Sequence, residues 1–121
     1  MSSKVLVADD SGVMRKIIIR ALNSCGITDI VEAADGAEAL ARFKEHKFDL
    51  VMTDWNMPNK TGLEAVQDIR ATGSDVPIIM ITTEAETTRV RDAIQAGVND
   101  YLAKPFDNDL LKQKIDKFVC V

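Results

Sequence analysis

Short apolar runs alternate with segments of helical periodicity along the whole chain. The runs are predicted strands, because runs of this length between polar or turn residues are typical of buried strands. They cover residues 5–8, 29–33, 48–53, 76–82 and 100–103. Apolar residues at helical spacing predict helices at about residues 13–25, 35–43, 63–72, 85–96 and 107–119. Gly26, Gly73 and Gly97 follow three of these helices and are suited to ending them.

This alternation predicts an α/β fold in which right-handed crossovers place helices on both sides of a parallel sheet. The runs at residues 5–8, 48–53 and 76–82 are almost continuously apolar, as in strands that are buried on both faces. A closed barrel of eight strands would need about twice this length. We therefore expect one doubly wound domain, (βα)5, with a parallel five-stranded sheet.

Four of the predicted strands are followed by polar residues suited to phosphate chemistry. Asp9 and Asp10 come after the first strand, and Asp54 follows the third. Thr82 ends the fourth strand, and Lys104 follows the fifth. Because ligands of open α/β sheets bind at the carboxyl ends of the strands, we expect these side chains to converge at one edge.

Three carboxylates in one crevice require positive charge nearby. Two unit charges about 4 Å apart repel by roughly 4 kcal/mol at an effective dielectric constant near 20. Lys104 offsets one of the three charges, and a divalent cation would neutralise the rest. A small set of oxygen ligands favours Mg²⁺ with several retained waters. Helix N-capping is the alternative role of such aspartates, and it would explain Asp9 or Asp10 alone better than it explains them together with Asp54 and Lys104.

Such a site either hydrolyses a bound substrate or accepts a phosphoryl group on Asp54. A phosphoryl group has three oxygens, and the metal, Lys104 and the Thr82 hydroxyl would each contact one of them. The loops show no His, Ser or Cys nucleophile beside a base. The sequence therefore favours acceptance of a phosphoryl group on Asp54.

Four separated motifs, in this order and spacing, resemble the response-regulator receiver domain over essentially the whole chain. They are residues 4–11 (KVLVADDS), 53–58 (TDWNMP) with Gly62, 81–85 (ITTEA) and 101–106 (YLAKPF). The resemblance implies a flavodoxin-like sheet with strand order 2-1-3-4-5, an order already described for this family. It also implies that residues 1–121 form a single receiver domain without an effector domain, similar to the single-domain chemotaxis regulators of the family.

The resemblance gives roles to the residues around the metal. Asp54 matches the phosphoacceptor, which also contacts Mg²⁺. Asp10 matches a direct Mg²⁺ ligand, and Asp9 matches a ligand acting through water. Asn56 matches the position whose backbone carbonyl completes the metal site. Asn56 and Glu84 flank the acceptor and Thr82 in the sequence, so they either steer the water that hydrolyses the acyl phosphate or are solvated loop residues.

The resemblance also implies a switch. Thr82 and Lys104 match the hydroxyl and the lysine that pair with the phosphoryl group. Tyr101 matches the aromatic residue that turns inward when Thr82 moves, and the bond between Lys104 and Pro105 matches one that is typically cis. The expected partner surface comprises Ala85, Val90, Tyr101, Ala103 and Phe106. Ile94 is assigned either to this surface or to the core.

The implied function is that of a two-component response regulator. A histidine kinase would phosphorylate Asp54, and the switched surface would bind a flagellar motor switch protein or another output protein. A phosphatase is a further candidate partner. The protein would catalyse only its own phosphorylation and dephosphorylation. One alternative is an intermediate phosphoryl carrier in a phosphorelay.

Two alternatives belong to other classes. A Mg²⁺-dependent phosphatase with an aspartate nucleophile would resemble an Asp-x-Asp pattern, whose second acid is replaced here by Asn56. A flavodoxin-like FMN carrier would have its flavin phosphate repelled by Asp9 and Asp10.

The composition of the chain excludes some classes of binding partner and indicates where the protein is located. The net charge of −4 over 121 residues argues against a basic nucleic-acid-binding face. The chain lacks an apolar stretch of about 20 residues and a signal-peptide core, so we expect a cytoplasmic monomer that does not bind membranes.

Cys25, Cys120 and His46 are expected to have incidental roles. Trp55 is either a partner contact or simply a neighbour of the acceptor. Lys112, Lys114 and Lys117 are expected to form a solvated helix face.

Overall fold

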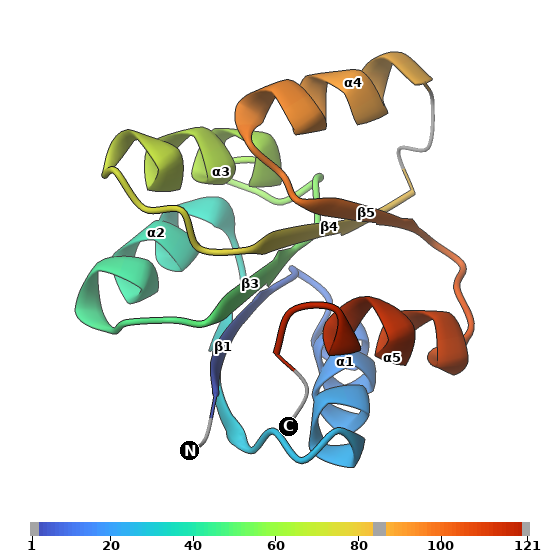
Figure 1. Ribbon diagram of the computed structural model, residues 1–121. Coiled ribbons are helices and arrows are strands. Elements are labelled where there is room, and N and C mark those ends of the chain that lie inside the picture. The colour runs from blue at the N-terminus through green and yellow to red at the C-terminus, as the bar shows by residue number, and fades with distance from the viewer. Residues whose placement is uncertain (1–2, 84–86, 120–121) are drawn as a thin grey trace.

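The structure is a computed structural model that describes residues 3–83 and 87–119 (Figure 1). Its five strands form one parallel sheet in the order β2-β1-β3-β4-β5. The strands are β1 (Lys4–Ala8), β2 (Asp29–Ala33), β3 (Leu50–Thr53), β4 (Ile78–Thr82) and β5 (Asp100–Ala103). The predicted fold class and the strand order implied by the resemblance are confirmed.

Two strands begin later than the sequence predicts. β3 begins at Leu50 rather than at residue 48, and β4 begins at Ile78 rather than at residue 76. Pro77 has no N–H to give to a neighbouring strand, although its carbonyl accepts a hydrogen bond from the Val51 amide at 2.9 Å. Apolar character therefore extends beyond the hydrogen-bonded part of each strand.

Five helices connect or follow the strands. They are α1 (Gly12–Ser24), α2 (Gly36–Glu45), α3 (Gly62–Ala71), α4 (Thr87–Ala96) and α5 (Asn108–Asp116). Ser11, Asp35, Thr61 and Asp107 cap four of the helices through their side chains. As predicted, α1, α3 and α4 are followed by glycines with positive φ, at Gly26, Gly73 and Gly97.

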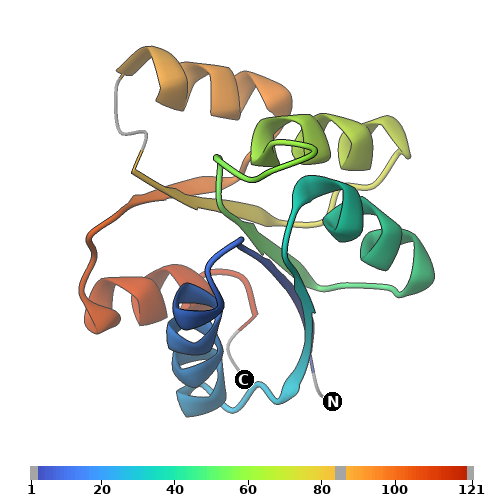
Figure 2. The same cartoon turned by 180° about the vertical axis from the view of Figure 1, so that it is seen from behind.

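The helices cover the sheet in two layers (Figures 1 and 2). Alternate residues of each strand point to opposite faces. Val7, Met52 and Ile79 pack in the cluster that includes residues of α1 and α5. Leu6 and Met80 belong to the opposite cluster, which includes residues of α2, α3 and α4. The sheet is therefore buried on both faces, and its carboxyl edge is left for the polar strand ends.

The two ends of the described chain lie close together, away from that edge (Figure 1). The Ser3 hydroxyl lies 3.5 Å from the Val119 carbonyl oxygen, to which it donates.

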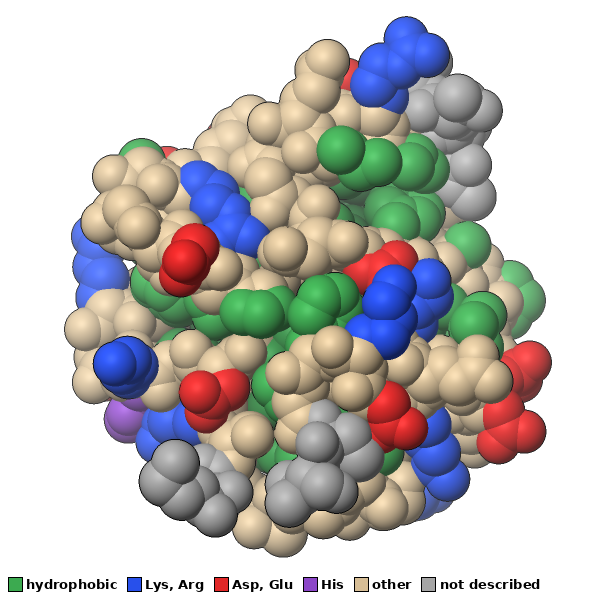
Figure 3. Space-filling model, viewed as in Figure 1, with side chains coloured by type: hydrophobic (Ala, Val, Ile, Leu, Met, Phe, Trp, Pro, Cys, Tyr) green, Lys and Arg blue, Asp and Glu red, His purple; other side chains and the backbone are tan. Residues whose placement is uncertain are grey.

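In the view of Figure 3, acidic and basic side chains are scattered over the surface, with hydrophobic side chains showing between them. Among the described residues, no helix has the length and apolar character needed to cross a membrane.

Candidate functional site

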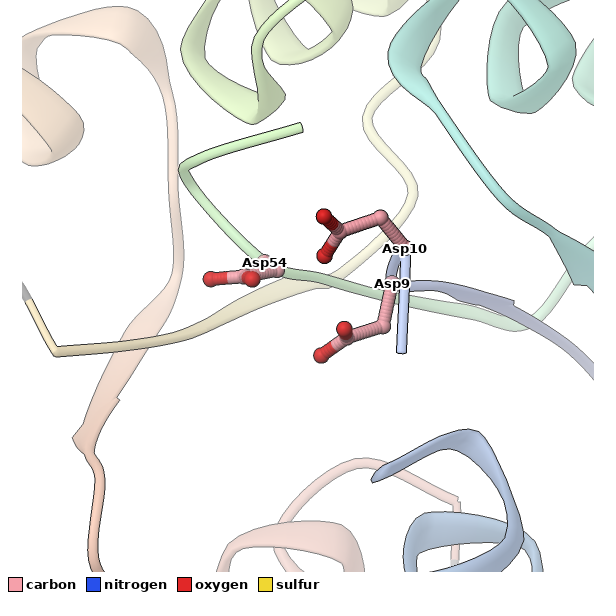
Figure 4. Close-up of side chains that lie close together, drawn as sticks. All are labelled: Asp9, Asp10 and Asp54. Atoms are coloured by element: carbon pink, nitrogen blue, oxygen red, sulfur yellow. The ribbon is translucent and has the colours of Figure 1, made fainter. Parts of the chain in front are cut away.

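Three carboxylates meet at the carboxyl edge of the sheet (Figure 4). Asp9 and Asp10 follow β1, Asp54 follows β3, and one oxygen of each lies within 4.8 Å of the others. Asp9 and Asp54 are only 1% and 8% exposed, whereas Asp10 is open to solvent. The predicted convergence of these aspartates is therefore present, and it combines two buried carboxylates with one exposed one.

The loop after β1 is fixed by backbone hydrogen bonds and by Arg15. The Asp9 amide donates to the Ala33 carbonyl at 3.0 Å, and the Asp9 carboxylate accepts a hydrogen bond from the Ser11 amide at 2.9 Å. The Arg15 guanidinium donates to the Asp9 carbonyl at 2.6 Å and to Glu32 at 2.9 Å. Arg15 thus links the acidic loop to β2.

The loop after β3 is held tightly at the acceptor. The Asp54 amide donates to the Ala8 carbonyl at 2.9 Å, and the Trp55 amide donates to Asp54 Oδ1 at 2.7 Å. The Gly62 amide then donates to the Trp55 carbonyl at 2.7 Å. A side chain at Gly62 would overlap the carbonyl of Asp54, so this close return of the chain requires glycine.

Lys104 supplies positive charge to two of the carboxylates. Its ammonium lies 3.0 Å from Asp9 Oδ2 and 3.3 Å from Asp54 Oδ2. The Lys104 amide donates to the Thr82 carbonyl at 2.9 Å, which places the lysine at the end of β5 beside β4. This ammonium offsets one of the three negative charges of the cluster, so the cluster keeps excess negative charge that a cation can neutralise.

Burial raises the pKa of Asp54 above its ordinary value. Lys104 acts in the opposite direction, and the nearby charge of Asp9 raises the pKa further. The ionised form of Asp54 is therefore less favourable than that of a carboxylate in water. This is the electrostatic condition under which binding of a divalent cation is favoured.

The N-cap alternative for these aspartates is wrong. Ser11 caps α1 through a hydrogen bond that its hydroxyl accepts from the Met14 amide at 3.2 Å. Thr61 caps α3 and forms a capping box with Glu64. Because other residues cap both helices, helix capping does not account for the meeting of the three carboxylates.

Thr82 and Tyr101, the residues expected to form the switch, lie on the neighbouring strands β4 and β5. Thr82 is fully buried at the end of β4, between β3 and β5. Tyr101 packs against the core cluster that includes α3 and α4 residues, and its hydroxyl oxygen is buried. Asn56 is exposed, and Glu84 lies outside the described residues.

The expected partner surface is only partly described, because Ala85 also lies outside the described residues. Val90 and Ala103 are half-buried, and Phe106 packs against the core cluster that includes α1 and α5 residues. Ile94 is 60% exposed, so its assignment to the core is wrong.

Trp55 is 3% exposed, which makes it a buried neighbour of the acceptor and not a surface contact.

The expectation of a solvated lysine face is wrong for Lys114, whose side chain is 23% exposed, whereas the Lys117 side chain is 59% exposed. The Lys114 ammonium lies 2.9 Å from one oxygen of Asp100, and the Lys117 ammonium lies 2.9 Å from the other. Sequence reasoning missed this cluster because Asp100 opens β5, whereas both lysines lie more than ten residues later. Helical spacing of Lys114 and Lys117 was the available signal, since residues three apart on a helix share a face.

Comparison with known proteins identifies the family. A family model described as the response regulator receiver domain matches residues 5–116. The chain belongs to the response-regulator receiver family. Receiver domains of this CheY-like kind are signalling proteins rather than classical enzymes.

Curated relatives of this receiver domain are chemotaxis proteins. The chain is 42% identical to the chemotaxis protein CheY of Pseudomonas aeruginosa over 116 residues, which cover 94% of both chains. It is 45% identical to a chemotaxis protein CheY homolog of Campylobacter jejuni, covering 93% of this chain and 89% of that protein. The predicted likeness to the single-domain chemotaxis regulators of the family is confirmed.

Solved structures agree with this receiver fold. CheY4 of Vibrio cholerae superposes with a TM-score of 0.90 at 33% identity, covering 98% of this chain and all of that one. The receiver domain of a sensor histidine kinase from Pseudomonas aeruginosa has a TM-score of 0.86 at 32% identity, with 98% of each chain covered. That structure has a magnesium ion coordinated in its active-site cleft.

Proposed function

We propose that this protein is a two-component response regulator that accepts a phosphoryl group on Asp54 from a phosphohistidine of a histidine kinase. The observation that carries the proposal is the meeting of Asp9, Asp10, Asp54 and the Lys104 ammonium at one edge of the sheet. Receiver-family membership and CheY relatives give independent support.

The donor set fits Mg²⁺. Asp9, Asp10 and Asp54 offer only oxygen atoms, their carboxylates lie close together, and the cluster carries excess negative charge. We assign Asp10 and Asp54 as direct ligands, Asp9 as a ligand through water, and the Asn56 backbone carbonyl as a further ligand. When bound, Mg²⁺ supplies the positive charge that neutralises the oxygens of the transferred group.

The chemical step assigns distinct roles to the protein groups. A carboxylate oxygen of Asp54 attacks phosphorus and forms an acyl phosphate, while the phosphorus–nitrogen bond of the donor histidine breaks. The released imidazole keeps the electron pair and takes up a proton. Lys104 already contacts Asp54, so its ammonium is placed to pair with one phosphoryl oxygen. The Thr82 hydroxyl pairs with another.

The output step is a shift between two conformations. Movement of Thr82 toward the phosphoryl group leaves space that Tyr101 occupies, and this biases the surface formed by Ala85, Val90, Tyr101, Ala103 and Phe106. The likeness to chemotaxis proteins favours a flagellar motor switch protein as the partner. Asn56 and Glu84 tune hydrolysis of the acyl phosphate, and a separate phosphatase is a further partner.

The test is phosphorylation by acetyl phosphate followed by intact-mass spectrometry. The wild-type protein should gain one phosphoryl group with Mg²⁺ and none with EDTA. Asp54→Asn should gain none under either condition. Asp75→Asn, which changes an exposed carboxylate before β4, should behave as wild type. Undiminished labelling of Asp54→Asn would show that another residue is the acceptor.

A second candidate function is that of an intermediate phosphoryl carrier. It is favoured by the likeness to the receiver domain of a sensor histidine kinase. A carrier passes its phosphoryl group back to a histidine domain, so loss of the acyl phosphate would be accelerated by a histidine-containing phosphotransfer domain. A motor regulator would instead bind a motor switch protein more tightly when phosphorylated.

A further inference from the structure

An arginine of α4 covers the tryptophan beside the acceptor. The Arg89 guanidinium carbon lies 5.5 Å from the centre of the Trp55 ring, within the range of a cation–π contact. Arg89 is exposed, whereas Trp55 is buried in the core cluster. The guanidinium therefore lies between the indole ring and solvent, and it joins the first turn of α4 to the loop after β3.

Trp55 is in direct contact with the acceptor through its backbone. Its amide donates to Asp54 Oδ1 at 2.7 Å, and its carbonyl accepts from the Gly62 amide at 2.7 Å. A phosphoryl group or a metal ion on Asp54 changes the charge and orientation of the carboxylate that this amide contacts. Trp55 therefore senses the acceptor at its backbone and contacts α4 at its side chain.

We propose that Arg89 is a positioning residue that couples the state of Asp54 to α4 through the Trp55 ring. This inference rests on the proposed acceptor role of Asp54, and it adds a second route beside the one through Thr82 and Tyr101. Because this coupling passes through the contact of Arg89 with the Trp55 ring, a change at Arg89 must alter the response of α4 to the state of Asp54. A cation over an aromatic face at an exposed site shifts an equilibrium by about two- to fivefold.

The geometry distinguishes Arg89 from its neighbour Arg91. Both arginines are exposed on α4, but residues two apart on a helix point to different sides. Replacing either by Met removes one positive charge and keeps a residue of similar helix propensity. Arg91→Met is therefore the matched control for Arg89→Met, and Arg89→Lys keeps the charge over the ring.

The first measurement uses the metal-free, unphosphorylated protein. Trp55 is the only tryptophan of the chain, so fluorescence reports on this ring alone. We expect acrylamide to quench Trp55 at least twofold more strongly in Arg89→Ala than in wild type. Arg91→Ala should match wild type. Equal quenching in Arg89→Ala and wild type would overturn the placement of Arg89 over the ring.

The second measurement follows hydrogen exchange of α4 before and after phosphorylation with acetyl phosphate and Mg²⁺. We expect the ratio of exchange rates between the two states to change by about two- to fivefold in Arg89→Met relative to wild type. The ratio should be unchanged in Arg91→Met and restored toward wild type in Arg89→Lys.

The outcomes separate this inference from the proposed function. If the protein is not phosphorylated on Asp54, the acceptor assignment fails. If it is phosphorylated but Arg89→Met and wild type give the same exchange ratio, the coupling through Trp55 is refuted. The coupling is also refuted if Arg91→Met changes the ratio as much, or if Arg89→Lys does not restore it.

Discussion

At Asp54, burial and the charge of Lys104 have opposite effects on the pKa of the carboxyl group. Burial raises its pKa, and the Asp9 charge adds to this effect, while Lys104 only partly compensates. Folded Asp54 therefore binds its proton more tightly than unfolded Asp54. The folded state loses stability as the pH rises from the ordinary carboxylate pKa through the raised one.

Asp54→Asn should therefore stabilise the metal-free protein at neutral pH. Removing a buried and incompletely compensated charge should raise the free energy of unfolding by on the order of 1 kcal/mol. The gain should shrink as the pH falls toward the ordinary carboxylate pKa. Urea unfolding at a series of pH values, from the ordinary carboxylate pKa up to neutral pH, measures this difference. Asp116→Asn, an exposed carboxylate on α5, serves as the control, and a destabilised Asp54→Asn at neutral pH would contradict the raised pKa.

For individual residues, the sequence predicts which side chains meet at the edge of the sheet but not every contact that they make. Asp9, Asp54 and Lys104 converge because each follows a parallel strand, and that follows from topology alone. The contacts of Arg15 with the Asp9 carbonyl and of Arg89 with Trp55 depend on side-chain rotamers and helix placement. Residue spacing carries no signal for either.

Among the elements, the turn between β3 and α3 depends most strongly on a single residue. Gly62 begins α3, and a Cβ there would overlap the Asp54 carbonyl. Gly62→Ala should therefore destabilise the protein by about 1–3 kcal/mol or more, and it should impair labelling of Asp54. Gly12→Ala is the matched control, because Gly12 begins α1 and its nearest contact would be Arg15 at 3.6 Å. Chemical denaturation measures both effects, and equal stabilities would contradict the close return of the chain.

The ion pairs that Lys114 and Lys117 form with Asp100 of β5 predict a second effect of pH on the stability of the fold. Burial raises the pKa of Asp100, but hydrogen bonds from Lys114, Lys117 and the Tyr101 amide, with the charge of Lys114, together hold the pKa below its ordinary value. This contribution to stability is present above the ordinary carboxylate pKa and is lost as the pH falls through the lowered one.

Asp100→Asn should therefore cost about 1–2 kcal/mol at neutral pH, the range for hydrogen bonds to a charged group with some solvent screening. The loss should vanish in acid. Lys114→Met should destabilise more than Lys117→Met, because the Lys117 side chain is mostly exposed. Thermal unfolding at several pH values measures these differences, and an equal loss for both lysines would argue against the role of burial.

The elements themselves were largely predictable. All ten are present in the predicted order, because buried strands and amphipathic helices have distinct apolar spacing, although α5 ends at Asp116 rather than at residue 119. The starts of β3 and β4 were not predictable, since Phe48 and Val76 are buried without belonging to the strands. Burial and strand hydrogen bonding are separate properties, and an apolar pattern reports only the first.

For the whole molecule, the carboxylate cluster links metal binding to folding. A ligand that binds only the folded state stabilises it by about 1.4 kcal/mol when present at ten times its dissociation constant. Mg²⁺ should therefore raise the unfolding temperature of the wild-type protein. Asp10→Asn should reduce this increase, while Asp75→Asn should not. Differential scanning fluorimetry with and without Mg²⁺ tests the prediction, and an equal response in Asp10→Asn would remove Asp10 from the metal site.

Ser3 and Val119, the two ends of the described chain, lie within 3.5 Å of each other. Both residues lie away from the edge that carries Asp54, because β1 begins and α5 ends at the opposite side of the sheet. A short flexible linker can join them, and new ends can then be opened in a surface turn such as the one after α2. Circularly permuted forms of this domain would carry fused sensors or tags on a chosen side without obstructing the acidic crevice.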